Sequence, residues 1–535
     1  MHSCRRALLA VAGIASIAAA AIGLSPGVLG ASPPGYSIAT LDKYGGEPSI
    51  VSDTAGRLYD TTPSIGTLTY RSTNHGTSWT QVATADPGSG DDCLATDQSG
   101  AVYLCNLNGT KEVVPLQADV WKSVDHGQTW TQGQPIARQA SVCAASCSPF
   151  GVDRDWVAAS IPAPLSDTGH AEVVLMYHDF YGPSQIWVNI SHDGGATFSP
   201  AQPVLATAVQ GDPTTAVVVG AETFCNTVPA GVAIAPPGTP HAGRIFVAWI
   251  AADPVQNPTG CNVTMLQSFH NLFLSYSDDN GVTWAAQQAF DAGIGHDAST
   301  PFIAFTIDNQ GNPYFGFTIN LKSDPTCSTK SGAALQSASS CEYDTYLVWS
   351  NDGGRTWDGG GGPLPGSAAT AYRVSPPSET GTHLFPTISA GDPGKVVVGY
   401  LRTPLIEPTD ALGKFLPGGC SGSTAVPYTV GPCPWNLYAA QSVNLIAGPS
   451  GATWAGHLQP RHLLHARTFE PPPARLQHVG ARSAGLQPHR LRRRQHREQA
   501  ARRQPVGKLH PDQEVGRPNN GGAGLRLPRR GTIAI

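Results

Sequence analysis

The chain has 535 residues, a formal net charge of −5 at pH 7 and eleven cysteines. It contains no glycine-rich nucleotide-binding loop, no Cys-x-x-Cys pair and no cluster of histidines. We therefore expect no cofactor, no bound metal and no nucleic-acid partner. Beyond the first thirty residues, no apolar stretch is long enough to span a membrane.

Residues 1–30 have the features of a secretion signal. Arg5 and Arg6 precede the apolar run 7–24, and small residues follow at 28–32. A membrane anchor is the alternative, but the small residues behind an alanine-rich run favour cleavage. We expect a secreted protein with no membrane anchor after the signal is removed.

Six hairpin patterns then follow one another along the chain. Each consists of an apolar strand, a turn rich in glycine, proline or aspartate, and a second apolar strand. They occupy residues 47–60, 92–105, 155–179, 232–250, 301–317 and 385–401.

An octamer of the form Ser-x-Asp-x-Gly-x-Thr-Trp follows each of the first five hairpins. The five copies are STNHGTSW (72–79), SVDHGQTW (123–130), SHDGGATF (191–198), SDDNGVTW (277–284) and SNDGGRTW (350–357). After the sixth hairpin, GPSGATW (448–454) keeps only the glycine, threonine and tryptophan. Repetition of this kind is typical of a repeat architecture.

The second octamer shows why these residue types are used. Ser123 and Asp125 can bond nearby backbone N–H groups, Gly127 can adopt positive φ, and Trp130 anchors the next strand. The octamer is therefore a predicted hairpin turn. Asp193, Asp279 and Asp352 take the place of Asp125 in later copies. Metal or substrate binding is the alternative role, but turn formation already accounts for the aspartates.

These octamers resemble the Asp boxes, or BNR repeats, of sialidase-like β-propellers over roughly residues 38–454. The resemblance implies an all-β fold, a six-bladed β-propeller with Asp-box turns. We expect this domain to span residues 31–455, with the last blade incomplete.

Ten cysteines follow the signal, an even number that predicts disulfides in an exported protein. Connectivity does not follow from sequence alone, and zinc binding is the alternative. Pairing of neighbours would join Cys93 to Cys105, Cys143 to Cys147, Cys225 to Cys261, Cys327 to Cys341 and Cys420 to Cys433.

The end of the blades opposite the boxes is the expected functional face. Long irregular connections lie there, at residues 253–271, 320–343 and 402–433, and the proposed disulfides would fasten them. Long loops of this kind are usually functional or disordered.

The resemblance also implies candidate catalytic residues. Sialidases hold the substrate carboxylate with three arginines, and a tyrosine assisted by a glutamate is the nucleophile. Gly46 stands where the first arginine belongs. The candidates here are Arg154, Arg373 and Arg402 as a substitute clamp, and Glu342 with Tyr343 as the nucleophile pair. Asp60 is a further catalytic candidate, because we expect it to end a second strand at the same face.

Other interpretations of these residues stay open. The three arginines are alternatively surface partners of neighbours such as Asp153 and Asp155, and adjacent residues such as Glu342 and Tyr343 point to opposite sides of a strand. Arg57, Arg244 and Arg355 fall in turns at the box end, where we expect solvated side chains.

Two functions are consistent with the sequence. The first is an exo-glycosidase of exo-α-sialidase type that acts on extracellular glycans. The second is a non-catalytic propeller that binds carbohydrate or protein and has lost the arginine clamp. In either case the expected partner is an extracellular glycan or glycoprotein.

Residues 456–535 differ in composition from the rest of the chain. They contain fifteen Arg, one Lys and four Asp or Glu, a net charge of +12, with Phe469 as the single aromatic residue. We predict that this basic tail, rich in Arg, His, Pro and Gln, is disordered or read from a shifted frame.

Overall fold

A computed structural model gives the fold, and nearly all of the residues it describes lie between 39 and 445. The main stretches outside the described residues are 1–38, 42–47, 87–90, 108–117, 135–151, 162–169, 180–185, 208–216, 252–268, 321–333, 359–370, 407–435, 446–453 and 456–531. The predicted signal and most of the basic tail therefore lie outside the described residues.

The described part is all-β and is built mainly from four-stranded antiparallel sheets, each following the chain order. The first contains β2 (Ser49–Ser52), β3 (Leu58–Ser64), β4 (Gly66–Ser72) and β5 (Thr80–Gln81). The second contains β6 (Asp92–Thr96), β7 (Val102–Leu107), β8 (Ala118–Ser123) and β9 (Thr131–Gln132).

Two further sheets have the same order. One contains β10 (Val152–Ser160), β11 (Glu172–Asp179), β12 (Ile186–Ser191) and β13 (Gln202–Pro203). The other contains β17 (Thr227–Ile234), β18 (Ile245–Ala251), β19 (Asn271–Ser277) and β20 (Ala285–Asp291).

An eight-stranded sheet completes the series and consists of two four-stranded units joined by one parallel pair, Tyr343 with Thr382. The first unit contains β21 (Ala304–Ile307), β22 (Pro313–Asn320), β23 (Tyr343–Trp349) and β24 (Tyr372–Arg373). The second contains β25 (Thr382–Ala390), β26 (Val396–Thr403), β27 (Asn436–Ser442) and β28 (Trp454–Ala455).

Two small sheets lie outside this series. One contains β14 (Ala206–Thr207), β15 (Val217–Val219) and β16 (Glu222–Phe224), and the sequence analysis did not predict it. The other pairs β1 (Thr40–Leu41) with β29 (Thr532–Ile533), two residues of the basic tail.

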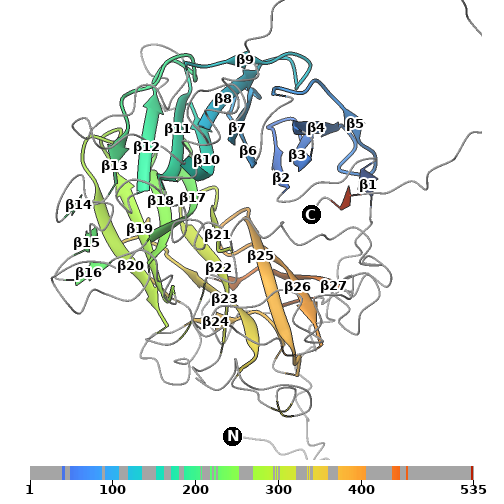
Figure 1. Cartoon of the computed structure of the whole chain (residues 1–535), viewed down its shortest axis with the longest axis vertical. Coiled ribbons are helices and arrows are strands. Elements are labelled where there is room, and N and C mark those ends of the chain that lie inside the picture. Colours follow the sequence, from blue (N-terminus) through green and yellow to red (C-terminus); the bar gives the residue numbers. More distant parts are fainter. Residues whose placement is uncertain are drawn as a thin grey trace, which may run out of the picture.

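The sheets follow one another around an arc in chain order (Figure 1). The first strand of each unit contacts the first strand of the next, from β2 to β6, β10, β17, β21 and β25. The first strands therefore line the inside of the arc.

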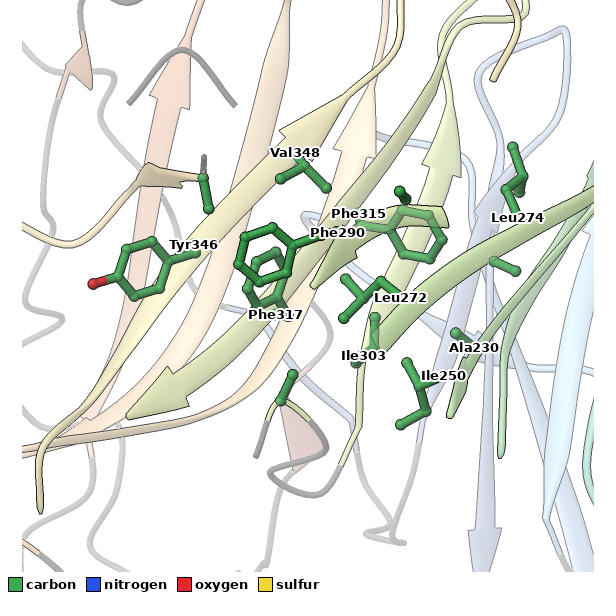
Figure 2. Packing of buried hydrophobic residues seen from close by; sticks show 14 of the residues in the cluster. Ala230, Ile250, Leu272, Leu274, Phe290, Ile303, Phe315, Phe317, Tyr346 and Val348 are labelled. Carbon is green, nitrogen blue, oxygen red and sulfur yellow. The ribbon is translucent and has the colours of Figure 1, made fainter. Parts of the chain in front are cut away.

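The hydrophobic core lies between neighbouring sheets. Figure 2 shows one such layer, to which Phe290, Phe317, Leu272 and Ile250 belong. The ring centroids of Phe290 and Phe317 are 5.0 Å apart. Apolar side chains of β17–β20 and β21–β23 form this layer, and similar clusters fill the spaces between other adjacent sheets.

The five octamers form the turns that the sequence predicts. The Ser123 hydroxyl donates to Asp125 Oδ1 at 2.8 Å and accepts from the Gly127 N–H at 2.8 Å, while Asp125 accepts from the backbone N–H and hydroxyl of Thr129. Gly127 has φ 83°. The pKa of Asp125 is lowered to about 2, and the largest cause is the hydrogen bond that its carboxylate accepts from the Thr129 hydroxyl.

The first octamer keeps this geometry with a different donor. Asn74 accepts from the Ser78 N–H at 2.9 Å, and its own amide donates to the Ser78 hydroxyl at 2.8 Å. Because an amide can donate where a carboxylate only accepts, serine and asparagine exchange roles here.

We expect Ser123→Ala to lower the free energy of unfolding by about 1–3 kcal/mol. The substitution removes the acceptor of the buried Gly127 N–H, which then has neither water nor protein to bond. Urea denaturation measures the effect, with exposed Ser389→Ala as the control. Equal stability of the two variants would contradict the assignment.

A second repeated turn connects the first two strands of three sheets. Asp53 accepts from the backbone N–H groups of Ala55 and Arg57 and from the hydroxyl of Tyr59. The same bonds occur at Asp97 with Tyr103 and at Asp308 with Tyr314. The spacing Asp-x-x-Gly-x-x-Tyr was present in the sequence, but its aspartate–tyrosine bond was not predicted.

The sixth box begins earlier than its remnant suggests. Ser442 and Asn444 bond one another as the first residues of a box do, and β28 pairs with β27 after an insertion. Only the later Gly-x-Thr-Trp part was predicted from the sequence.

One predicted disulfide, Cys93–Cys105, joins directly paired residues of β6 and β7. Cys341 is also disulfide-bonded. The remaining predicted pairs involve cysteines outside the described residues, and their pairing stays a prediction. Within the described part of the chain, no helix has the length and apolar character that crossing a membrane requires.

Candidate functional site

Each four-stranded unit has two ends. The box end carries the Asp boxes and the hairpins between first and second strands. The far end carries the starts of the first and third strands and the ends of the second strands. Apart from Asp60, the predicted catalytic residues lie at the far end, in or next to β10, β23, β24 and β26.

Arg154 lies near the start of β10 in a strained conformation. Its φ is 60°, and the pairing of β10 with β11 shifts register between Asp153 and Trp156. The residue is only 8% exposed. Its guanidinium carbon lies 4.0 Å from the ring centroid of Phe302 and 5.5 Å from that of Trp156.

Phe385 occupies a similar position on β25. Its φ is 49°, and it lies within a register shift between Leu384 and Thr387. The ring centroids of Phe385 and Phe302 are 5.5 Å apart. Positive φ at non-glycine residues is costly and concentrates at functional sites.

We call Arg154, Trp156, Phe302 and Phe385 the aromatic platform. The three aromatic side chains are partly exposed, and they come from β10, from the residue two before β21 and from β25. Three units that are far apart in sequence therefore contribute to one cluster at the far end. None of the three aromatic residues was predicted, and no sequence signal marked them.

Arg154 also affects the histidine behind it. His178 is buried at the end of β11, and burial, followed by the positive charge of Arg154, lowers its pKa to about 3. The imidazole is therefore neutral over the physiological range, which suits a structural role for this histidine.

The other two arginines of the predicted clamp bond the connection between β24 and β25. Arg373 donates to Asp344 at 2.6 Å and to the carbonyl oxygens of Pro376 and Glu379. Arg402 donates to the carbonyl of Thr380 and to the hydroxyl of Tyr438. Both guanidinium groups therefore have structural partners.

The predicted nucleophile pair is buried. Tyr343 is 0% exposed and Glu342 is 7% exposed. Glu342 accepts a hydrogen bond of 2.8 Å from the Gly381 N–H. Glu342 therefore stabilises the backbone of the β24–β25 connection at Gly381.

The expectation that Asp60 ends its strand was wrong: it is the third residue of β3, opposite Ile50 of β2, and the strand continues to Ser64. It is fully buried, and neither carboxylate oxygen has a hydrogen-bond partner among the described residues. Burial raises its pKa to about 8. Asp92 is also buried, accepts from the Thr61 hydroxyl, and has a pKa raised by burial and then by repulsion from Asp60.

The expectation that Arg244 is solvated was wrong. Its side chain is 2% exposed and donates to Asp278 through Nε at 2.6 Å and Nη2 at 2.7 Å, and to the Gly353 carbonyl at 2.7 Å. The guanidinium also lies 4.4 Å from the Tyr276 ring. This arginine links boxes of adjacent units. Arg355 is exposed, as predicted, and Arg57 pairs with Asp53.

Among the described residues, no group of three or more His, Cys, Asp or Glu side chains is arranged to hold a metal ion. The Asp-box aspartates bond their own turns, as the turn interpretation requires.

Comparison with known proteins gives structural neighbours only. No family model and no curated protein sequence matches. A protein of unknown function from Dyadobacter fermentans is 13% identical with a TM-score of 0.38, over 69% of this chain and 94% of that one. An α-L-arabinanase from Penicillium chrysogenum is 16% identical with a TM-score of 0.37, over 69% and 91%. A Hadza microbial sialidase is 15% identical with a TM-score of 0.35, over 66% and 62%. Likeness at this level does not transfer an activity to this chain.

Proposed function

We propose that the chain is a secreted, six-bladed sialidase-like β-propeller that binds extracellular glycans through the aromatic platform. Its five Asp-box turns and the chain-ordered four-stranded units support the propeller architecture. The Cys93–Cys105 disulfide fits an oxidising compartment, and the signal features of residues 1–30 fit export.

The convergence of Arg154, Phe302, Phe385 and Trp156 carries the proposal of glycan binding. Partly exposed aromatic rings offer flat apolar surfaces to the apolar face of a sugar ring. The guanidinium of Arg154 packs against the Phe302 and Trp156 rings and joins them in one cluster. Arg154 and Phe385 both have positive φ, a costly backbone conformation that is concentrated at functional sites.

Binding without hydrolysis is favoured over sialidase activity. Arg373 and Arg402 bond backbone carbonyls and a tyrosine, Tyr343 is buried, and Gly46 replaces the first arginine of the family motif. A clamp of three arginines on a substrate carboxylate would need these groups in one accessible place.

An exo-glycosidase of sialidase type is the second candidate, and Asp60 is the observation that favours it. A carboxyl group with a pKa of about 8 is protonated at neutral pH, as a general acid must be. Its complete burial is the argument against it, because a substrate would have to reach the side chain.

The two candidates predict different results with the secreted full-length protein. We expect saturable binding to immobilised mucin or to an array of sialylated, neutral and uronic-acid oligosaccharides, without release of fluorophore from a fluorogenic sialoside. Absence of binding to all of these probes would contradict glycan recognition. Efficient sialoside turnover that is lost in Arg154→Ala or Arg402→Ala would instead establish the glycosidase and identify its clamp.

A further inference from the structure

The connection between β24 and β25 is held by charged groups from several strands, of which Glu342 and Asp344 are buried. It leads directly into β25, and Phe385 of the aromatic platform follows only a few residues later. Its described contacts are Arg373 with the carbonyls of Pro376 and Glu379, Arg402 with the Thr380 carbonyl, Glu342 with the Gly381 N–H, and Tyr400 with the Glu379 carboxylate.

His383 is located at the centre of this network. Its side chain is fully buried, and its two ring nitrogens face two different carboxylates. Nδ1 lies 3.6 Å from Oδ1 of Asp344 on β23, and Nε2 lies 3.6 Å from Oε2 of Glu379 in the connection. The Tyr400 ring packs against the imidazole with centroids 4.9 Å apart.

The charges around His383 balance only with one added proton. Three carboxylates and two guanidinium groups leave one excess negative charge around a buried imidazole. A neutral imidazole donates through one nitrogen, whereas an imidazolium donates through both, one toward each carboxylate. The titratable or charged groups that face the network are Glu342, Asp344 and Tyr346 on or next to β23, Arg373 on β24, Glu379 in the connection, Tyr400 and Arg402 on β26, and Tyr438 on β27.

We propose that His383, Asp344 and Glu379 form a one-proton latch. When a single proton is bound by this group, it fastens the β24–β25 connection and fixes the start of β25, including Phe385. When the proton is lost, repulsion between the buried carboxylates loosens the connection. The effect on glycan binding rests on the function proposed above, whereas the latch itself does not.

The direction of the pH effect follows from Asp344. Burial raises its pKa to about 6, against the opposing effect of Arg373. A folded-state pKa above the ordinary value means that the folded state binds the proton more tightly than the unfolded chain does. The stabilisation is therefore present at acidic pH and is lost as pH rises through about 6.

Close packing transmits this change to the strand. Gly381 has φ 117°, and a Cβ atom there would lie 2.0 Å from the Thr403 carbonyl oxygen. The connection thus runs directly against the end of β26, and its movement must shift the first residues of β25.

Hydrogen–deuterium exchange of a peptide covering residues 378–386 tests the latch in the full-length protein. After correction for intrinsic exchange rates, we expect its protection to fall about tenfold between pH 5.5 and pH 8. Glu379→Gln and Asp344→Asn each remove one negative charge, so each should keep high protection at both pH values. Having two variants on different elements guards against misfolding of either one.

Asp392→Asn is the matched control. Asp392 lies at the other end of the β25–β26 hairpin, where it pairs with Lys395 in solvent, so the tenfold change should persist. Equal protection of the wild-type peptide at both pH values would overturn the proposal. A wild-type pH dependence in both charge-removing variants would overturn it as well.

Mucin binding measured at the same two pH values separates the two proposals. The latch predicts weaker binding at pH 8 in the wild type and equal binding in Glu379→Gln. An exchange change with no mucin binding at either pH supports the latch and contradicts mucin recognition. Mucin binding without a pH-dependent change in hydrogen–deuterium exchange contradicts the latch alone.

Discussion

Replacing Asp60 with asparagine is expected to stabilise the protein at alkaline pH. Asp60 is fully buried, no residue in the described part of the chain bonds its carboxylate, and burial raises its pKa to about 8. Because this pKa is raised, the folded state favours the protonated carboxyl. The stability contributed by the proton is complete below the ordinary pKa of 3.8 and is lost as pH rises toward 8.

The size of the expected change in unfolding free energy follows from the difference between the ordinary and the folded-state pKa of Asp60. Between pH 5 and pH 9 the wild type should lose about 3–4 kcal/mol more unfolding free energy than Asp60→Asn, at about 1.4 kcal/mol per pH unit over which the states differ. Urea denaturation of both proteins at the two pH values measures the difference. Asp92 stays in both proteins, although its pKa should fall once its charged neighbour is gone.

Asp125→Asn is the control for this experiment. Its carboxylate is ionised at both pH values, so its effect on stability should not change between them. If the difference between wild type and Asp60→Asn is the same at pH 5 and pH 9, Asp60 is already ionised in the folded protein and its assignment as a buried neutral acid is wrong.

Replacing Phe302 with alanine is expected to weaken glycan binding by roughly tenfold to thirtyfold, the range for a central aromatic contact. Both Arg154 and Phe385 contact the Phe302 ring, so its removal eliminates the contacts that join these two residues in the aromatic platform. Titration of mucin or of the tightest array oligosaccharide against both proteins provides the measurement.

Tyr276, at the box end of the sheets, provides a matched control. Tyr276 also lies beneath a guanidinium, that of Arg244, but at the box end. Tyr276→Ala removes a comparable ring and should leave glycan affinity unchanged even if it lowers stability. Equal losses of affinity in the two variants would mean that the effect of Phe302→Ala is only structural.

Local chemistry explains which features could be predicted from the sequence. The Asp-box turn is completed within eight residues by bonds among Ser123, Asp125, Gly127 and Thr129, so its sequence pattern is sufficient to predict it. Cys93 and Cys105 lie across one short hairpin, and their pairing was predicted for the same reason.

Features that depend on contacts between sheets could not be predicted in this way. Arg244 is in a turn, where arginine is usually solvated, yet the adjacent unit supplies the Gly353 carbonyl that buries it. Arg373 and Arg402 lie at the far end of the sheets, as predicted. Their guanidinium groups, however, donate hydrogen bonds to backbone carbonyls of the β24–β25 connection.

The sequence by itself therefore determined the repeated hairpins, their turns and the end of the sheets at which function was expected, because each depends on bonds between residues close in the chain. Only the tertiary structure decided which side chains meet there. Arg154, Phe302 and Phe385 are separated by many residues, and packing of three units brings them together. The burial of Asp60 and His383 is likewise a property of neighbouring sheets, since water is excluded only after those sheets have packed.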